Sequence, residues 1–220
     1  MAYKIYLVRH GQTILNRYNK MQGWCDSPLT PKGIEDGKMA GQHLKHLKFD
    51  YAFHSDTTRA QRTCGYILAE NDHPTPQPLA LENFREQGYG YFEGADSSQA
   101  WLMIGATHNC RTFKELITQY SIEEARDFCK EQDPFHQAEN NQEFWNRLGQ
   151  GFAYIAKIAQ DQQNILVVSH GTTIRSIVHH FDPTVDITQS PKNGSVTRLT
   201  VDHDQISVDY FSHYLDNDLY

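Results

Sequence analysis

Two histidines, each followed by glycine, stand at the ends of apolar segments that lie far apart in the chain. His10 follows residues 3–8 and is preceded by Arg9, and His170 follows residues 164–169. Short apolar runs of this kind predict buried strands. Ligands of open parallel α/β sheets bind at the carboxyl ends of the strands, so both imidazoles are expected in one pocket. A guanidinium beside an imidazole predicts a phosphate site in which the imidazole does chemistry.

The elements that must position these residues alternate between strand and helix patterns. Thr30 and Pro31, for example, predict a helix N-cap followed by proline in the first turn. The expected helices are 31–47, 57–70, 142–160 and 172–181. The expected strands are 3–8, 50–54, 164–169, 195–201 and 205–210, the last two forming a terminal hairpin. This alternation predicts an α/β three-layer sandwich with a mostly parallel sheet flanked by helices.

Residues 95–141 differ in character from the rest of the chain. They are polar, helical in pattern, and contain a capping-box signature at 121–124. We expect them to form a helical insertion over the active-site edge of the sheet. The chain of 220 residues is otherwise expected to form one domain, 1–220.

Composition restricts the class of protein and of partner. Hydrophobic residues make up 39% of the chain and the net charge is −7, with no basic run. Nucleic acid and anionic membranes are therefore not expected as partners. No apolar stretch approaches the roughly 20 residues of a membrane span, and the start lacks the apolar core of a signal peptide. With four cysteines and no CxxC spacing, we expect reduced thiols and a cytoplasmic location. A homodimer is compatible with the sequence, which does not fix the oligomeric state.

Five segments, in order, resemble the histidine phosphatase superfamily, also called the phosphoglycerate mutase-like family. The first is the RHG signature around His10, and the resemblance extends from residue 3 to about residue 180. The matching segments are 9–13 (RHGQT) with Asn16, 26–33 (DSPLTPKG), 55–63 (SDTTRAQRT), 86–94 (EQGYGYFEG) and 169–171 (SHG).

The resemblance implies a role for five residues. His10 would be the nucleophile and become a phosphohistidine, which divides one difficult step into two easier ones. Arg9 and Arg59 would hold the non-bridging phosphate oxygens. His170 would be a cationic or hydrogen-bonding partner across the phosphate, and Glu86 would be the general acid and then the base.

The remaining predicted binding residues border the same phosphate. Asn16 and the backbone N–H of Gly171 would complete the phosphate cradle, and Gln22 and Gly23 would belong to the loop beside the pocket. Because arginine and histidine would supply the positive charge, no metal and no cofactor are expected.

Three carboxylates near the middle of the chain compete for the acid role. Only Glu86 stands four residues before Gly90 and seven before Glu93, as the family pattern requires. Glu82 and Glu93 are therefore interpreted as surface carboxylates.

The reaction itself is predicted less directly than the site. Mutases of this family carry paired arginines in the insertion and asparagine after the second His-Gly, whereas this chain has single arginines, Arg111 and Arg126, and Thr172. These departures favour a metal-independent phosphomonoesterase acting on a small phosphate ester. The alternative is a cofactor-dependent phosphoglycerate mutase primed by 2,3-bisphosphoglycerate. A non-catalytic phosphate-binding module is disfavoured because the expected catalytic residues are all present.

Two further segments carry open predictions. Side chains of the insertion form either a polar and aromatic lid or ordinary lobe packing; they are Trp101, His108, Arg111, Phe113 and His136. Residues 216–220 form either a disordered acidic tail or a segment over the site entrance.

Overall fold

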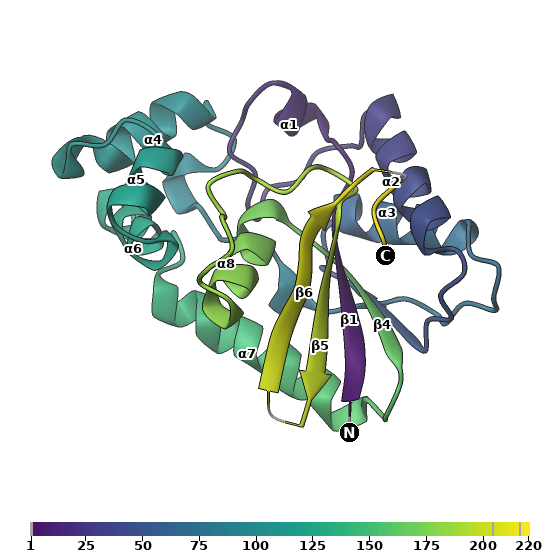
Figure 1. The fold of residues 1–220 in the computed structure, drawn as a ribbon. Helices are drawn as coiled ribbons and strands as arrows, with labels where there is room; N and C mark the ends of the chain where they lie inside the picture. Colours follow the sequence, from purple (N-terminus) through teal and green to yellow (C-terminus); the bar gives the residue numbers. More distant parts are fainter. Residues whose placement is uncertain (1, 204, 216) are drawn as a thin grey trace.

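Six strands form one mixed sheet in the order β3-β2-β4-β1-β5-β6 (Figure 1). The strands are β1 (Ala2–Arg9), β2 (Tyr51–His54), β3 (Leu79–Ala80), β4 (Asn164–Ser169), β5 (Val196–Asp202) and β6 (Gln205–His213). Neighbours are parallel from β3 to β1, and β5 is antiparallel to both β1 and β6. The α/β class with a mostly parallel sheet is confirmed, and the short edge strand β3 was not expected.

This computed structural model describes residues 2–203, 205–215 and 217–220. Met1, Asp204 of the expected hairpin turn and Asp216 of the C-terminal segment lie outside the described residues. The helices are α1 (Ile14–Arg17), α2 (Pro31–Leu44), α3 (Thr58–Ala69), α4 (Ser97–Gly105), α5 (Phe113–Gln119), α6 (Ile122–Gln132), α7 (Asn141–Ile158) and α8 (Gly171–Phe181), with 3-10 turns η1 (Glu82–Phe84), η2 (Gly90–Phe92) and η3 (Ala106–His108).

Helices cover both faces of the sheet, with α2 and α3 on one side and α7 and α8 on the other (Figure 1). Successive side chains of a strand point to opposite faces. In β1, Ile5 and Leu7 accordingly join the core under α7 and α8, whereas Tyr6 and Val8 join the core under α2 and α3. Because both faces are buried, the central strands are continuous apolar runs rather than alternating ones.

Local signals set the starts of helices better than their ends. Thr30 caps α2 by accepting a hydrogen bond from the N–H of Gly33, as its position before Pro31 predicts. The helix ends at Leu44, three residues before the expected end, because the N–H of Leu47 turns back to the carbonyl of Leu44. The four-residue α1 was not among the expected helices.

Helices α4, α5 and α6 form a lobe beside the upper end of the sheet in Figure 1, which confirms the helical insertion. The lobe has an apolar core of its own that includes Ile104, Leu116 and Cys129. All four cysteines are free thiols. Of these, Cys25 is half-buried on a loop and the other three are buried in the cores.

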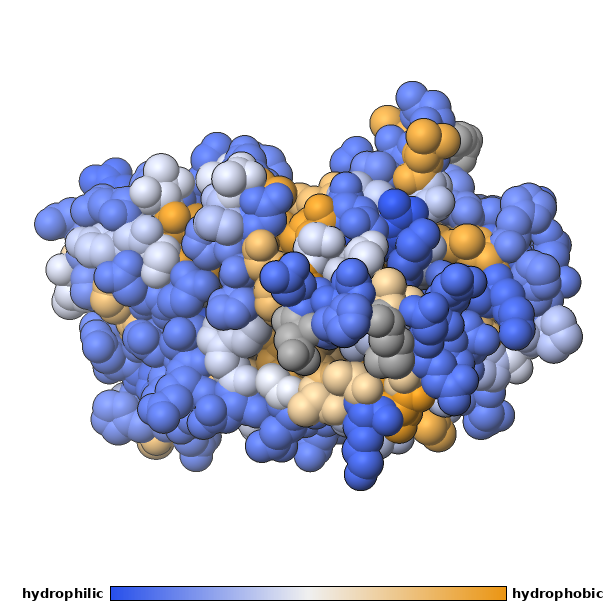
Figure 2. Space-filling model, turned by 60° about the horizontal axis from the view of Figure 1, so that its bottom comes forward, coloured by the Kyte–Doolittle hydropathy of each residue, from blue (hydrophilic) through white to orange (hydrophobic). Residues whose placement is uncertain are grey.

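The opposite end of the sheet, where β1 begins, faces the reader in Figure 2. Hydrophilic side chains cover most of this surface, and several smaller apolar areas lie between them. Among the helices of the described residues, none has the combination of length and hydropathy that crossing a bilayer requires.

Candidate active site

Strand register brings the two histidines together. In the parallel pair β1 and β4, Arg9 lies opposite Ser169, so His10 and His170 follow at neighbouring positions of the sheet edge. Their ring centroids are 5.1 Å apart. His10 is 3% exposed and His170 is fully buried. The two imidazoles therefore lie side by side at one edge of the sheet.

The glycines of two distant segments make this edge possible. A Cβ atom on Gly11 would lie 2.0 Å from the carbonyl oxygen of Gly33, and neither backbone could avoid it. The RHG segment and the start of α2 therefore touch through backbone alone. The N–H of Gly11 also donates to Thr63 Oγ1 (3.0 Å), which ties the turn after His10 to α3.

Hydrogen bonding determines which nitrogen of His10 is available. Nδ1 lies 2.8 Å from the carbonyl oxygen of Gly11. Because a carbonyl only accepts, Nδ1 carries the proton and Nε2 keeps its lone pair. Burial, followed by the charges of Arg59 and Arg9, lowers the pKa of His10 well below its usual value. The imidazole is thus neutral and nucleophilic at neutral pH.

Arg59 is fully buried and links His170 to the loop at residues 22–26. Its Nη2 donates to the carbonyl of Gly23 (2.6 Å) and lies 3.1 Å from Nδ1 of His170. Its Nη1 donates to the carbonyl of Cys25 and to Asp26 Oδ1, at 2.8 and 3.0 Å. The guanidinium is therefore aimed before any ligand arrives.

Gln22 completes the surroundings of Arg59. Its side-chain carbonyl accepts from Nε and Nη1 of Arg59 at 2.9 and 3.1 Å, while its amide nitrogen donates to Thr13 and Ser27. Burial, followed by the charge of Arg59, lowers the pKa of His170 well below its usual value. Of the two roles expected for His170, the ligand-free site therefore favours the hydrogen-bonding one over the cationic one.

Glu86 is buried at the N-terminus of α8. Its Oε1 accepts from the N–H groups of Gln87 and Thr173 and from the Thr173 hydroxyl, at 2.8–3.0 Å. Its Oε2 accepts one hydrogen bond, from the N–H of Thr172 at 2.8 Å. A helix N-terminus stabilises a carboxylate, and Oε2 is the oxygen with capacity left for a proton.

Arg9 has a buried N–H group that lacks a partner among the described residues. Its Nη1 donates to the carbonyl of Pro191 and to Ser190 Oγ, at 2.5 and 3.2 Å. Its Nε is buried and has no hydrogen-bond partner among the described residues. A buried donor without a partner is costly, and a phosphoryl oxygen would satisfy it.

A cavity of about 230 Å³ opens beside these groups. Arg9, Asn16, Gln22, Glu86 and Gly171 lie on its wall. The other predicted site residues are buried and do not line this cavity; they are His10, Gly23, Arg59 and His170. No described residue of 217–220 lines the cavity; Tyr220 instead packs on His43 of α2, so the tail does not cover the entrance.

Sequence reasoning missed two cations of the cavity. Lys20 and Arg175 both line it. Arg175 donates to the carbonyls of Ile187 and Thr188, and burial lowers its pKa to about 10, so it stays charged at neutral pH. Its position six residues after Ser169 on α8 was available in the sequence, but nothing there indicated that the side chain turns toward the cavity.

Glu93 is not the surface carboxylate that was expected. Its oxygens accept from the N–H groups of Gly23, Trp24, Cys25 and Tyr89 at 2.8–3.1 Å. This one side chain therefore holds the loop whose carbonyls receive Arg59. These N–H groups converge on one carboxylate only in the folded protein, so the contact could not be predicted from the sequence.

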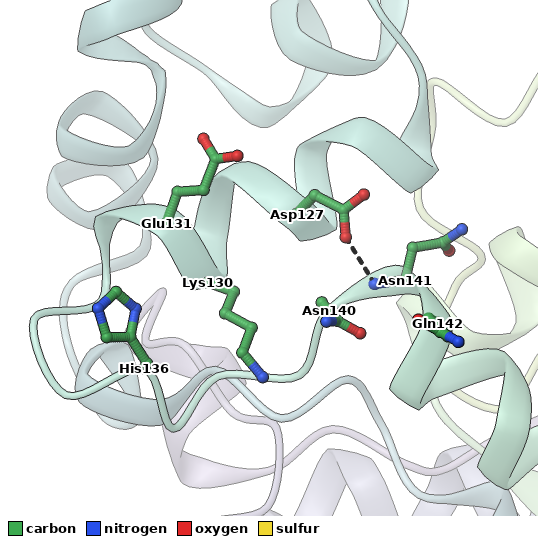
Figure 3. Close-up of a pocket in the computed structure, with 7 residues that line it drawn as sticks. All are labelled: Asp127, Lys130, Glu131, His136, Asn140, Asn141 and Gln142. Carbon is green, nitrogen blue, oxygen red and sulfur yellow. Dashed lines mark hydrogen bonds between the residues drawn. The ribbon is translucent and has the colours of Figure 1, made fainter.

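The insertion contributes less to the cavity than expected. Trp101 and Phe113 line it, but His108 stacks on Phe128 at 3.5 Å between ring centroids. His136 lies on a different hollow of about 600 Å³, between α6 and the start of α7 (Figure 3). In that hollow Asp127 accepts from the N–H of Asn141. None of the predicted catalytic or phosphate-binding residues lines it.

Neither arginine of the insertion reaches the cavity. Arg111 is exposed, and Arg126 is buried beneath the lobe, where it donates to Asn141 and Ser176. Within residues 2–203, 205–215 and 217–220, no three His, Cys, Asp or Glu side chains are placed to hold a metal ion.

Comparison with known proteins decides the family. A family model described as histidine phosphatase superfamily, branch 1, matches residues 5–103 and 102–213. The chain belongs to the histidine phosphatase superfamily. A 2,3-bisphosphoglycerate-dependent phosphoglycerate mutase of Xanthobacter autotrophicus is 33% identical to this superfamily member over 181 residues, which is 79% of this chain and 78% of that protein.

Solved structures agree with the fold. The phosphoglycerate mutase from Bacillus anthracis superposes with a TM-score of 0.90 at 30% identity, covering 97% of this chain and 94% of that one. The alpha-ribazole phosphatase from Shigella flexneri superposes with a TM-score of 0.69 at 22% identity over 96% of each chain. A mutase and a phosphatase thus share this fold, and the site must distinguish the two activities.

Proposed function

We propose that this protein is a metal-independent phosphomonoesterase that hydrolyses a small phosphorylated metabolite through a phosphohistidine on His10. The observation that carries the proposal is the lone pair on His10 Nε2, set by the Nδ1 bond to Gly11 and surrounded by Arg9, Arg59 and His170. A neutral nucleophile among cationic donors suits attack on an anionic phosphoryl group.

In the first step, Nε2 of His10 attacks phosphorus, the N–P bond forms and the ester P–O bond breaks. Arg9 donates through Nε to a non-bridging oxygen, and the charge of Arg59 stabilises the negative charge that develops on the phosphoryl group. The leaving oxygen takes a proton from the Glu86 carboxyl. Oε2 is the oxygen suited to carry this proton, because it accepts only the Thr172 N–H.

In the second step, water attacks the phosphohistidine. The Glu86 carboxylate, left without its proton, accepts one from that water. The N–P bond breaks, inorganic phosphate forms and the His10 lone pair returns. The same carboxyl thus serves as acid and then base, as the two halves of the reaction require.

The inserted lobe supports hydrolysis over phosphoryl transfer within a substrate. Arg111 is exposed and Arg126 is buried away from the cavity, so the insertion presents no arginine to a second anionic group of a bound acceptor. Water then meets the phosphohistidine without competition. Lys20 and Arg175 on the wall, and a volume of about 230 Å³, favour a small anionic ester.

The phosphoglycerate mutase activity is the second candidate. The named relative and the structure from Bacillus anthracis favour it, since both are similar over most of the chain. It would require 2,3-bisphosphoglycerate to phosphorylate His10, and it would yield an isomer rather than free phosphate.

The test is phosphate release from an aryl phosphate in excess EDTA, from acid to neutral pH. His10→Ala is measured beside His180→Ala, a matched control on the exposed end of α8. We expect turnover that survives EDTA, disappears in His10→Ala and persists in His180→Ala. Because acid breaks the N–P bond, the phosphohistidine is detected by 31P NMR at neutral pH.

Other outcomes are equally definite. Isomer formation from 3-phosphoglycerate that needs the bisphosphorylated primer, without phosphate release, would establish the mutase instead. Equal binding of inorganic phosphate by wild type and His10→Ala, with no turnover of either substrate, would indicate a binding module.

A further inference from the structure

Both ring nitrogens of His170 are engaged by protein groups. Nδ1 lies 3.1 Å from Nη2 of Arg59, and Nε2 lies 2.7 Å from Oγ of Ser55. All three residues are fully buried. Ser55 matches the first position of a sequence segment in which only Arg59 was given a role.

The partners determine which nitrogen of His170 holds the proton. A guanidinium donates and never accepts, so Nδ1 must be the acceptor and carries no hydrogen. The proton of the neutral ring is then on Nε2, which donates to Ser55 Oγ. The partner of the distal nitrogen commonly sets the tautomer of a functional histidine.

Topology places Ser55 at the right point. β2 is parallel to β4 with His54 opposite Val168, so the residue after β2 stands beside the residues after β4. Oγ of Ser55 is also 3.0 Å from Oγ1 of Thr57. Thr57 is the N-cap residue of α3 but makes no side-chain capping bond, so its hydroxyl is available to Ser55.

We propose that Ser55, supported by Thr57, is a positioning residue that accepts the Nε2 proton of His170 and thereby holds the ring with Nδ1 turned toward Arg59. The inference rests on the proposed function, in which Arg59 and His170 stand beside the phosphoryl group. The bond to Ser55 Oγ fixes the rotation of the ring, and the ring in turn aligns Nη2 of Arg59.

The test compares two buried serines beside His170. Ser55→Ala removes the hydroxyl that contacts the ring. Ser169→Ala is the matched control, because Ser169 is also fully buried and precedes His170, but its hydroxyl donates to the carbonyl of Phe84 at 2.8 Å. Ser55→Thr retains the hydroxyl and serves as the rescue variant.

The first measurement is 15N NMR of histidine-labelled protein, with the His170 signal assigned by its loss in His170→Gln. Because Arg59 donates to Nδ1, we expect the Nε2–H tautomer in the wild type and in both serine-to-alanine variants. The Nε2–H proton should have the same chemical shift in the wild type and in Ser169→Ala, and it should move upfield in Ser55→Ala, where its acceptor is gone. With an aryl phosphate, Ser55→Ala should lower kcat by about 10- to 100-fold with little change in KM, the usual cost of losing a partner of a functional histidine. Ser55→Thr should restore most of kcat.

The proposal is overturned if the Nε2–H proton of Ser55→Ala keeps its wild-type chemical shift, or if Ser169→Ala lowers kcat as much as Ser55→Ala does. A protein without phosphatase turnover would contradict the proposed function instead. The comparison of Nε2–H shifts would still decide the role of Ser55 in that case, because it needs no substrate. Thermal unfolding of all three variants separates loss of fold from loss of positioning.

Discussion

Two arginines are fully buried in this protein, one at the edge of the sheet and one under the inserted lobe. Arg59 donates to two backbone carbonyls and to Asp26, and its Nη2 faces His170. Arg126 has no carboxylate partner within 4 Å among the described residues; it donates to Asn141 and Ser176 and stacks over Phe144 at 3.8 Å. Burial lowers its pKa to about 10.

The difference lies in what each guanidinium joins. Arg59 connects the loop of Gly23 to an imidazole, so its charge is directed at the place where a phosphoryl group would lie. Arg126 connects α6 of the lobe to α7 and α8, where it holds one layer to another. Two equally buried arginines can thus have different roles. Burial alone does not identify a functional arginine, and its hydrogen-bond partners must also be known.

The matched pair Arg59→Met and Arg126→Met tests this contrast most strongly. Arg59→Met should reduce kcat/KM for an aryl phosphate at least about 10³-fold, the scale of an arginine that stabilises phosphoryl transfer. Arg126→Met should leave kcat/KM within about threefold, because it touches no wall of the cavity. Steady-state kinetics on both variants provides the measurement, and similar losses in the two would remove the distinction.

Glu86 and Glu93 offer a second pair, since both carboxylates accept backbone N–H groups. Glu86→Gln should lower kcat by about 10²- to 10⁴-fold, because an amide neither donates the acid proton nor accepts one from water. Glu93→Gln should act mainly through KM, by loosening the loop that holds Arg59. An equal fall in kcat for both variants would argue against a chemical role that belongs to Glu86 alone.

Arg126→Met should instead show in stability. Losing the hydrogen bonds leaves the buried Ser176 hydroxyl and the half-buried Asn141 carbonyl without this donor, which costs about 1–3 kcal/mol in the free energy of unfolding. Urea unfolding followed by circular dichroism would measure it. A variant as stable as the wild type would mean that the aromatic contact of the new side chain compensates fully.

The lowered pKa of His10 predicts how stability depends on pH. Below about pH 6.5, the unfolded chain binds a proton at this histidine that the folded protein does not. The wild type should therefore lose up to about 1.4 kcal/mol of unfolding free energy per pH unit, relative to His10→Gln, as pH falls below 6.5. Parallel pH profiles for the two proteins would show that the folded state accepts the proton.

Arg111→Ala should have the smallest effect. The side chain is exposed and does not line the cavity, so kcat/KM with an aryl phosphate should stay within about twofold of the wild type. A large rise in KM would place this residue against the substrate and would revive the mutase alternative.

The sequence by itself determined the sheet edge and most of what stands there. The short apolar runs that end at Arg9-His10 and at His170 are local patterns, and the parallel register of β1 and β4 brings their ends to one edge. Gly11 and Gly33, which stand in the matching segments, allow two backbones to touch there. The helical insertion was also predictable, because capping residues and polarity act within a few positions of one another. The end of α2 and the strand β3 were not predicted: a turn from Leu44 to Leu47 ends α2, and β3 exists only through its pairing with β2.

Only the tertiary structure decided what the charged and polar side chains do. The hydrogen bonds of the His170 ring come from Ser55 and Arg59, which are 115 and 111 residues away in the chain. The burial of Arg126 and the turn of Arg175 toward the cavity likewise depend on other segments. Three of the four N–H groups on Glu93 also come from a distant segment. A side chain's type is local, but its hydrogen-bond partners and desolvation exist only once the layers have packed, and these set its chemistry.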